Sequence, residues 1–361
     1  MEYQLKSRQI CLFFLAFLPI IKLFTLPSML AKTCYEDMWI CSVFNILLDL
    51  TTLTFLISAC KKTNCNFYTL LEKSFGKIGS KVILALYFIM FMLKAIIPIN
   101  EQRDYVEFTL YTLMPTTYYF IPFFVLAIYF CTKKLRVLGR ISDIMWLPTI
   151  LGFLTLFLLS INNADISAIL PIGARGISAS LTGSYKSLTW FGDCAYLLFF
   201  IGEFSYQKKD GIKILLSYLV GAIMVIVFMI IFYSIFTSIA PFKRFALPEI
   251  SKYTTVINST GRFDYIGIIL LLLSNAFSLV IPLFFAVNIL NKIVGFKKKF
   301  ISPIIVVLIH LYITIFLNSH FYSIENFITN YCGFFFFILS NVLPIFTTFL
   351  VKKERKLEGK F

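Results

Sequence analysis

Long apolar segments alternate with short polar segments along the whole chain of 361 residues. Ten of the apolar segments have about the 20 residues that a helix needs to cross a bilayer. This pattern predicts an all-α polytopic membrane protein that forms one integral membrane domain over residues 1–361. The ten expected spans are residues 9–30, 38–59, 81–100 with a helical extension to about 113, 118–132, 141–161, 187–206, 212–238, 264–291, 300–318 and 327–350.

The composition fits a protein embedded in a lipid bilayer, and the distribution of charge orients it. Hydrophobic residues make up 59% of the chain, charged residues only 14%, and the mean hydropathy is +0.86. Most of the 33 lysines and arginines lie in clusters on one side of the expected spans, such as Lys297-Lys298-Lys299. Because basic loops stay in the cytoplasm, we expect both termini there. The basic clusters of these cytoplasmic loops explain the net charge of +15. We therefore expect no nucleic-acid partner.

The expected spans divide into two sets of five, at about 9–161 and 187–350, with a short basic tail at 351–361. The first span of each set is interrupted, by Pro19 with Lys22 nearby and by Gly192. Interrupted apolar segments at matching places in two halves of a chain point to a binding site near the bilayer midplane. We therefore expect a small-molecule cavity at the two breaks.

Asp193 is the first candidate for this cavity. A carboxylate in hydrocarbon costs several kcal/mol, so its side chain should face the interior of the helix bundle. It either holds a proton or a ligand ammonium group, or it is a structural partner of a lysine or tyrosine on another helix. Phe191 and Gly192 precede it, and glycine weakens a helix by roughly 1 kcal/mol, so these residues are expected at the break.

Lys22 is the most unusual residue for its place, because it lies inside the first expected span. Its ammonium group either replaces a bound cation or fixes a ligand carboxylate, or it extends to the membrane interface. If the two broken helices meet at the cavity, Lys22 and Asp193 are potential partners, since pairing lowers the cost of burying both charges. Lys94 is a further candidate for facing the cavity, with its role left open.

Small polar side chains on the eighth expected span form another candidate group. Asn275 and Ser278 are three residues apart, so they share one face of a helix. Such groups either coordinate a ligand or ion, or hold neighbouring helices together by hydrogen bonds.

A charged cluster follows the third expected span, and its members lie on one helix face at spacings of three and four residues. Arg103 and Glu107 are expected to pair. The cluster either fixes this helix against its neighbours, or it forms an entry vestibule or a surface that binds a partner. It consists of Glu101, Arg103, Asp104 and Glu107. Glu203, near the expected inner end of the sixth span, is either a cytoplasmic gate or an interfacial acid beside Lys208 and Lys209.

Cysteines and histidines give no sign of a metal site or of catalysis. The eight cysteines are scattered without metal-ligand spacing, and buried cysteine behaves as a small hydrophobe, so no disulfide framework is expected. The two histidines, His310 and His320, are close to one expected helix. No paired-carboxylate or Ser/His constellation stands out, so we expect no enzyme, no metal and no cofactor.

Several short motifs, in order over about residues 7–205, resemble those of the spore germination permease family, the B subunits of bacterial germinant receptors. That family belongs to the amino acid/polyamine/organocation transporter superfamily. The central residues Ile20-Ile21-Lys22 depart from the pattern, since the family tends to have small residues there. The matching motifs are Ser7-Arg8-Gln9, Leu26-Pro27-Ser28-Met29-Leu30, Glu36-Asp37-Met38-Trp39, Arg103-Asp104-Tyr105-Val106-Glu107-Phe108, Val137-Leu138-Gly139-Arg140, Ile169-Leu170-Pro171 and Phe191-Gly192-Asp193.

The resemblance implies a leucine-transporter-type fold of five plus five inverted helices. It also implies that a small nutrient, commonly an amino acid, binds between helices one, three, six and eight. The chain would then be a receptor subunit in the spore inner membrane that acts with A-type and C-type subunits. The alternative is a proton- or ion-coupled amino-acid transporter that uses the same cavity.

Overall fold

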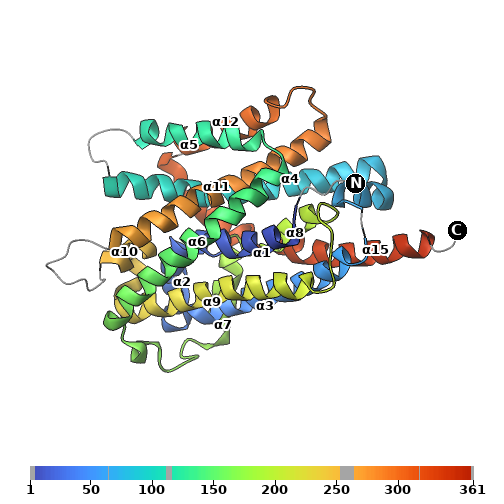
Figure 1. Ribbon diagram of the computed structural model, residues 1–361. Helices are drawn as coiled ribbons and strands as arrows, with labels where there is room; N and C mark the ends of the chain where they lie inside the picture. Colours follow the sequence, from blue (N-terminus) through green and yellow to red (C-terminus); the bar gives the residue numbers. More distant parts are fainter. Residues whose placement is uncertain (1–4, 64, 111–115, 253–263, 317, 359–361) are drawn as a thin grey trace.

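The computed structural model describes residues 5–63, 65–110, 116–252, 264–316 and 318–358 (Figure 1). These residues are helical apart from turns and one isolated β-bridge between Leu5 and Phe204. Six of the described helices are long and apolar enough to cross a membrane, or seven if the bent pair Ile301–Phe316 and Asn318–Tyr331 is one span. The chain is therefore a multi-pass membrane protein with the all-α architecture that its hydropathy predicts.

The first expected span of each half is a broken helix. The first, called helix one below, comprises α1 (Ser7–Ala16), a 3-10 turn at Ile20–Leu23, and α2 (Leu26–Cys34). The second, called helix six, comprises α7 (Gly176–Ser187) and α8 (Ala195–Phe200). Both interruptions fall where proline and glycine predict them. Helix six begins at Gly176, earlier than the expected position 187, because its first turns carry too many small polar residues for a hydropathy signal.

The other expected spans of the first half are long helices with internal prolines in several of them. α4 begins at Phe67, well before the expected position 81, because the first part of the helix is charged and carries no hydropathy signal. Gly76, at φ 71°, introduces a kink between this charged part and the apolar part. The part of the expected extension at 111–113 lies outside the described residues. These helices are α3 (Met38–Cys60), α4 (Phe67–Leu110), α5 (Thr116–Cys131) and α6 (Leu135–Ser160).

The second half contains three long helices after helix six. Its last expected span, the tenth, is interrupted. That last span, expected at 327–350, starts at Phe321, is interrupted at Cys332 and contains a π turn at Ile338–Val342. The helices are α9 (Asp210–Phe236), α10 (Ala246–Lys252), α11 (Asp264–Val294), α12 (Ile301–Phe316), α13 (Phe321–Tyr331), α14 (Gly333–Phe337) and α15 (Leu343–Glu358), so the expected tail is helical as far as Glu358.

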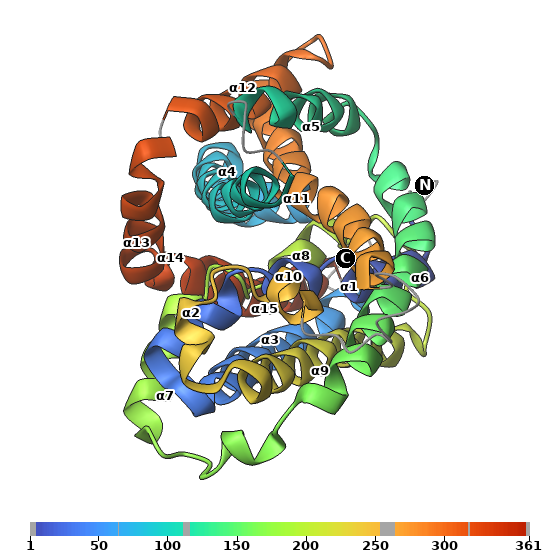
Figure 2. The same cartoon turned by 90° about the vertical axis from the view of Figure 1, so that its left-hand side faces the viewer.

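α1 and α8 lie in the interior of the bundle, whereas α7 lies at its edge in Figure 2, with Ile177 73% and Leu181 54% exposed. α1 packs against α6 and α9, whereas α11 packs against α4 and α6. The N- and C-terminal ends of the chain lie toward the same end of the bundle in Figure 1. Many large apolar side chains point outward, for example Leu126 at 65% and Leu158 at 63% exposure, as a lipid-facing surface requires.

An aromatic cluster fills the bundle between the breaks and the end at which the termini lie. Phe91 stacks on Tyr196 at a ring-centroid distance of 5.4 Å and on Phe285 at 5.6 Å. Phe13 of α1 meets Phe200 of α8 edge to face at 5.2 Å. Such pairs contribute roughly 0.5–1.5 kcal/mol each beyond the apolar area that they bury. The cluster therefore seals this side of the two broken helices.

Candidate functional site at the breaks of two helices

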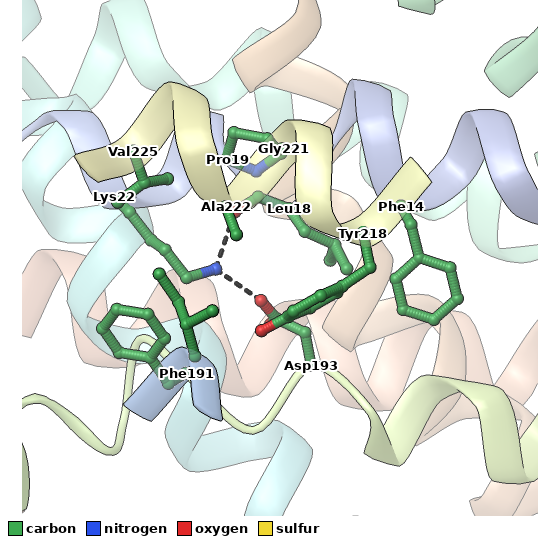
Figure 3. A pocket seen from close by; sticks show the side chains of 11 residues that line it. Phe14, Leu18, Pro19, Lys22, Phe191, Asp193, Tyr218, Gly221, Ala222 and Val225 are labelled. Carbon is green, nitrogen blue, oxygen red and sulfur yellow. Dashed lines mark hydrogen bonds and ion pairs between the residues drawn. The ribbon is translucent and has the colours of Figure 1, made fainter. Parts of the chain in front are cut away.

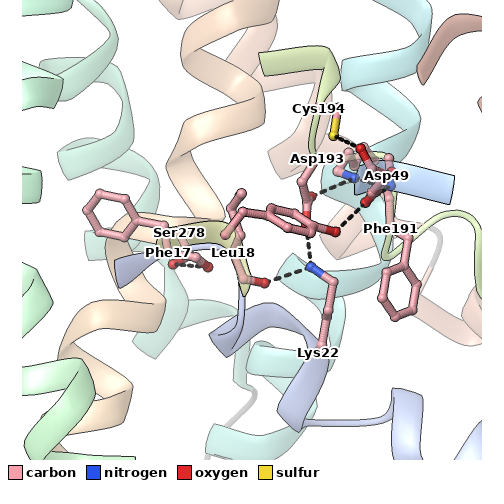
Figure 4. Close-up of polar contacts among 11 residues, drawn as sticks. Phe17, Leu18, Lys22, Asp49, Phe191, Asp193, Cys194 and Ser278 are labelled. Atoms are coloured by element: carbon pink, nitrogen blue, oxygen red, sulfur yellow. Dashed lines mark hydrogen bonds and ion pairs between the residues drawn. The ribbon is translucent and has the colours of Figure 1, made fainter. Parts of the chain in front are cut away.

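The break of helix one leaves three successive backbone carbonyls without helical partners, and a side chain binds each of them. Pro19 has no N–H group and cannot continue the helix. Thr149 of α6 donates to the carbonyl of Ala16 at 3.0 Å, and Ser278 of α11 donates to that of Phe17 at 3.2 Å. The Lys22 ammonium donates to the carbonyl of Leu18 at 2.7 Å (Figure 4). Because water is scarce at membrane depth, these bonds make the break possible.

At the break of helix six, charged side chains likewise form hydrogen bonds with backbone groups that have no helical partner. Gly192 has φ 75°, which favours glycine, and a Cβ atom there would lie 2.5 Å from Ser340 of the π turn. The Lys94 ammonium donates to the carbonyl of Phe191 at 2.5 Å. The amide of Gly192 donates to the Asp49 carboxylate at 3.2 Å. Helices α3 and α4 thus supply the partners that helix six lacks.

Four charged side chains meet between the two breaks, and we call Lys22, Asp49, Lys94 and Asp193 the charge cluster. Lys22 hydrogen-bonds directly to Asp193, and the Lys94 ammonium lies 3.3 Å from the same carboxylate. All four are buried, with exposures between 1% and 5%. Two lysines balance two aspartates, so the formal charges cancel. Loss of one member would leave an unpaired buried charge, which typically costs about 3–5 kcal/mol.

Asp49 is the member of this cluster that the sequence analysis missed. Its carboxylate accepts hydrogen bonds from the Tyr218 hydroxyl at 2.9 Å and from the Gly192 amide, while its own backbone carbonyl accepts one from the Cys194 thiol at 2.9 Å (Figure 4). The signal was present, because Asp49 is the lone acid in the apolar segment 38–59. The rule that selects Asp193, an acid within a membrane span, selects Asp49 equally.

A small pocket lies beside the Lys22–Asp193 pair (Figure 3). Pro19, Lys22, Phe191 and Asp193 are among its lining residues, together with Tyr218 and other side chains of α9. Its free volume is only about 10 Å³, which is about the space of one water molecule. In this conformation the pocket therefore has no space for a molecule much larger than water.

The two candidates on α11 have different surroundings. Ser278 reaches the break of helix one through its bond to Phe17, and it also donates to the carbonyl of Ser274 at 3.0 Å. Asn275 instead donates to the side chain of Gln102 at 2.7 Å and is not among the residues that line the pocket. Both hold α11 against a neighbouring segment, and only Ser278 does so at a break.

The candidate charged cluster on α4 lies toward the end of the bundle opposite the termini. Arg103 pairs with Asp104 rather than with Glu107, which is exposed, and it also donates to the carbonyl of Thr314 at 2.7 Å. The expected Arg103–Glu107 pair is thus replaced, because Arg103 points into the bundle. Asp104 accepts a second bond from Arg244 at 2.5 Å. Glu101 is buried and accepts a hydrogen bond from Thr25 at the start of α2.

Glu203 lies at the opposite end, just after α8. Its backbone carbonyl accepts a bond from the amide of Leu5 at 3.0 Å, which joins the segment before α1 to the end of helix six. Among the described ion pairs, none joins Glu203 to Lys208 or Lys209. Nearby, the side chains of Arg8 and Gln9 donate to Asp143 of α6 at 3.0 and 2.7 Å. These bonds close the bundle at the end where the termini lie.

Comparisons with known proteins identify a family and a fold. Residues 4–328 match a family model described as spore germination protein. A manganese transporter of Eremococcus coleocola, solved as a histidine-to-alanine variant, shares the fold with a TM-score of 0.59 and 10% identity over 95% of this chain and 78% of that chain. The same transporter in complex with an aromatic bis-isothiourea substituted compound gives the same score and identity over 94% and 78%. No curated protein sequence matches the chain.

Proposed function

We infer, since this chain belongs to the spore germination protein family, that it is a B-type subunit of a nutrient germinant receptor in the spore inner membrane. In this proposal a small nutrient, an amino acid, binds at the breaks of helix one and helix six. A-type and C-type subunits then respond to the change in the bundle. The observation that carries the proposal is the contact between Lys22 and Asp193, which joins the two breaks through side chains of opposite charge.

The proposed architecture has ten spans in two inverted sets of five, with both termini in the cytoplasm. Each expected span overlaps a helix or a broken helix among the described residues, and the first span of each set is broken. The fold similarity to a transporter over 95% of the chain supports this arrangement. The basic clusters of the sequence support the orientation.

The charge cluster is suited to a zwitterionic ligand. An ammonium group of the ligand can replace that of Lys22 at Asp193, and a carboxylate can bind the lysines that are then released. Because the pocket has space for about one water, the ligand can enter only if Lys22 and the turn that carries it move. Ligand binding therefore favours a second conformation by its differential affinity for the two.

A coupled amino-acid transporter is the second candidate, and the fold similarity to a manganese transporter favours it. The same cavity would then open to both sides, and a carboxylate of the charge cluster would exchange a proton during the cycle. A receptor needs access from one side only.

Binding and accumulation of labelled amino acids in sealed proteoliposomes, with and without a pH gradient, test both functions. Saturable binding without accumulation supports the receptor, whereas accumulation that requires the gradient supports the transporter. Asp193→Asn should abolish the accumulation and the part of the binding that depends on the midplane cavity. Lys297→Met, at an exposed position outside the bundle core, is the matched control and should leave both unchanged. Binding and accumulation in Asp193→Asn that equal those of the wild type would refute a role for the cavity.

A further inference from the structure

A second and much larger pocket opens at the end of the bundle opposite the termini, the end that faces the viewer in Figure 2. Segments of α2, α7, α13 and the turn after α9 surround it. Its volume is about 570 Å³, within the range of about 300–1,000 Å³ that is typical of small-molecule sites. We call it the vestibule. It differs from the pocket beside Lys22 in volume, lining and charge.

The charges that line the vestibule are unequal in number. Lys32, Lys186 and Arg244 are cationic, and Glu325 is the acid among the lining residues. The Arg244 guanidinium is already bound to Asp104 at 2.5 Å. Among the described residues, the side chains of Lys32, Lys186 and Glu325 have no ion pair. Two lysines and one carboxylate therefore remain available to a ligand in one pocket.

These three groups define the chemistry of a ligand. Ammonium groups of lysine bind carboxylates as point charges, and two of them favour an anionic group between α2 and α7. The carboxylate of Glu325 on α13 suits a cationic group at the other side of the same ligand. We propose that the vestibule is a second binding site for zwitterionic small molecules of the amino-acid class. The carboxylate is held by Lys32 and Lys186 and the ammonium group by Glu325.

The vestibule is connected to the break of helix one by short contacts. Thr25 lines the vestibule, hydrogen-bonds to Glu101, and lies three residues after Lys22. Ser28, also in the lining, donates to the carbonyl of Lys243, and the amide of Ala246 donates to the carbonyl of Phe24 at 2.8 Å. A ligand in the vestibule thus contacts the segment that bears Lys22 without touching the charge cluster.

The vestibule would bind the same class of ligand as the midplane cavity of the proposed function, so the experiment must separate the two sites. The full chain in lipid nanodiscs is titrated with each of the 20 common amino acids in labelled form. The Lys22→Met/Asp193→Asn variant removes the proposed midplane site and leaves the vestibule intact. We expect saturable binding in this variant. Adding Lys32→Gln and Lys186→Gln should weaken that binding at least about tenfold, because charge-assisted bonds are lost.

The controls distinguish a lost site from a misfolded protein. Lys32 is exposed and Lys186 half-buried, so the glutamine variants should keep the thermal stability of the parent protein. Lys297→Gln, at the other end of the bundle, should leave binding unchanged. Propionate and ethylamine, which carry one charge each, should bind more weakly than alanine. Absence of binding in the midplane variant, or binding that is insensitive to the loss of Lys32 and Lys186, would overturn the proposal. A wild-type signal that depends on Asp193 alone would then leave the proposed function standing.

Discussion

The ammonium group of Lys94 lies 3.3 Å from the carboxylate of Asp193 and binds the carbonyl of Phe191, two residues earlier in the same break. One side chain of α4 thus fixes both the backbone and the charge of helix six. We expect Lys94→Met to lower the free energy of unfolding by about 3–5 kcal/mol, because it leaves a buried carbonyl and a buried carboxylate with fewer partners. Thermal unfolding in detergent measures this loss, and Lys297→Met should show none.

Lys22 and Asp193 should behave as one unit. Lys22→Met and Asp193→Asn each remove one side of the pair, so each should impair ligand binding and stability. The double variant should be no worse than either single variant, because the unpaired charge is then gone. A double-mutant cycle should therefore give a coupling energy about as large as the effect of one single variant, about 3–5 kcal/mol. Strictly additive effects would show that the contact has no energetic role.

Asp49 should matter more than the hydroxyl that binds it. Asp49→Asn removes a charge that balances the two lysines and weakens the bond from the Gly192 amide, so the cost should resemble that of losing Lys94. Tyr218→Phe removes one hydrogen bond and leaves the charge, which should cost about 1 kcal/mol. Chemical denaturation of both variants compares the two values. Equal losses would mean that Asp49 acts only as the acceptor for Tyr218.

Gly192 can be compared with Gly173, since both have positive φ values, 75° and 81°. An alanine at either position is strained by roughly 1–2 kcal/mol. Only at Gly192 would the added Cβ atom also collide with Ser340, because nothing lies within 4 Å at Gly173. We therefore expect Gly192→Ala to reduce the melting temperature more than Gly173→Ala. Adding Ser340→Gly to Gly192→Ala should raise the melting temperature to that of Gly173→Ala. If the melting temperature does not rise, the loss at Gly192 comes from backbone strain alone.

Two acids of the charged cluster on α4 carry the same charge but differ in burial, so their contributions to stability can be compared. Asp104 is buried and binds both Arg103 and Arg244, whereas Glu107 is exposed. Asp104→Asn should destabilise the protein by several kcal/mol, because two arginines lose their common partner. Glu107→Gln should remain within about 0.5 kcal/mol of the parent. Thermal unfolding of both variants measures the two losses. Equal losses would contradict the view that the buried Asp104 stabilises the bundle more than the exposed Glu107.

The sequence predicts much of this architecture because lipid imposes simple rules. Pro19 and Gly192 mark the breaks, and the acid or lysine beside each break shows where buried charge needs a partner. The start of α4 at Phe67 was missed because amphipathic, charged turns at the membrane surface produce no hydropathy signal. The π turn at Ile338–Val342, in which Ser340 packs against Gly192, was also missed, since contacts between distant segments leave no periodic signal in the sequence.

Pairing between helices is harder to predict than the presence of a charged residue. Arg103 has Glu107 at a favourable helical spacing and yet points toward Asp104 and the carbonyl of Thr314, because the bundle offers a buried site there. Asn275 likewise binds Gln102 rather than the pocket. Such choices depend on how α4 and α11 are rotated against each other, and periodicity within one helix does not specify that rotation.

The Lys22 ammonium binds both the carbonyl of Leu18 and the carboxylate of Asp193. Under the proposed function, the chain carries its own ammonium group at the place that a ligand ammonium must occupy. A tethered group of this kind competes at an effective concentration of about millimolar or more. The apparent affinity for a free nutrient is then reduced by that internal competitor. A dormant cell would gain from this a concentration threshold, below which traces of nutrient leave the receptor silent.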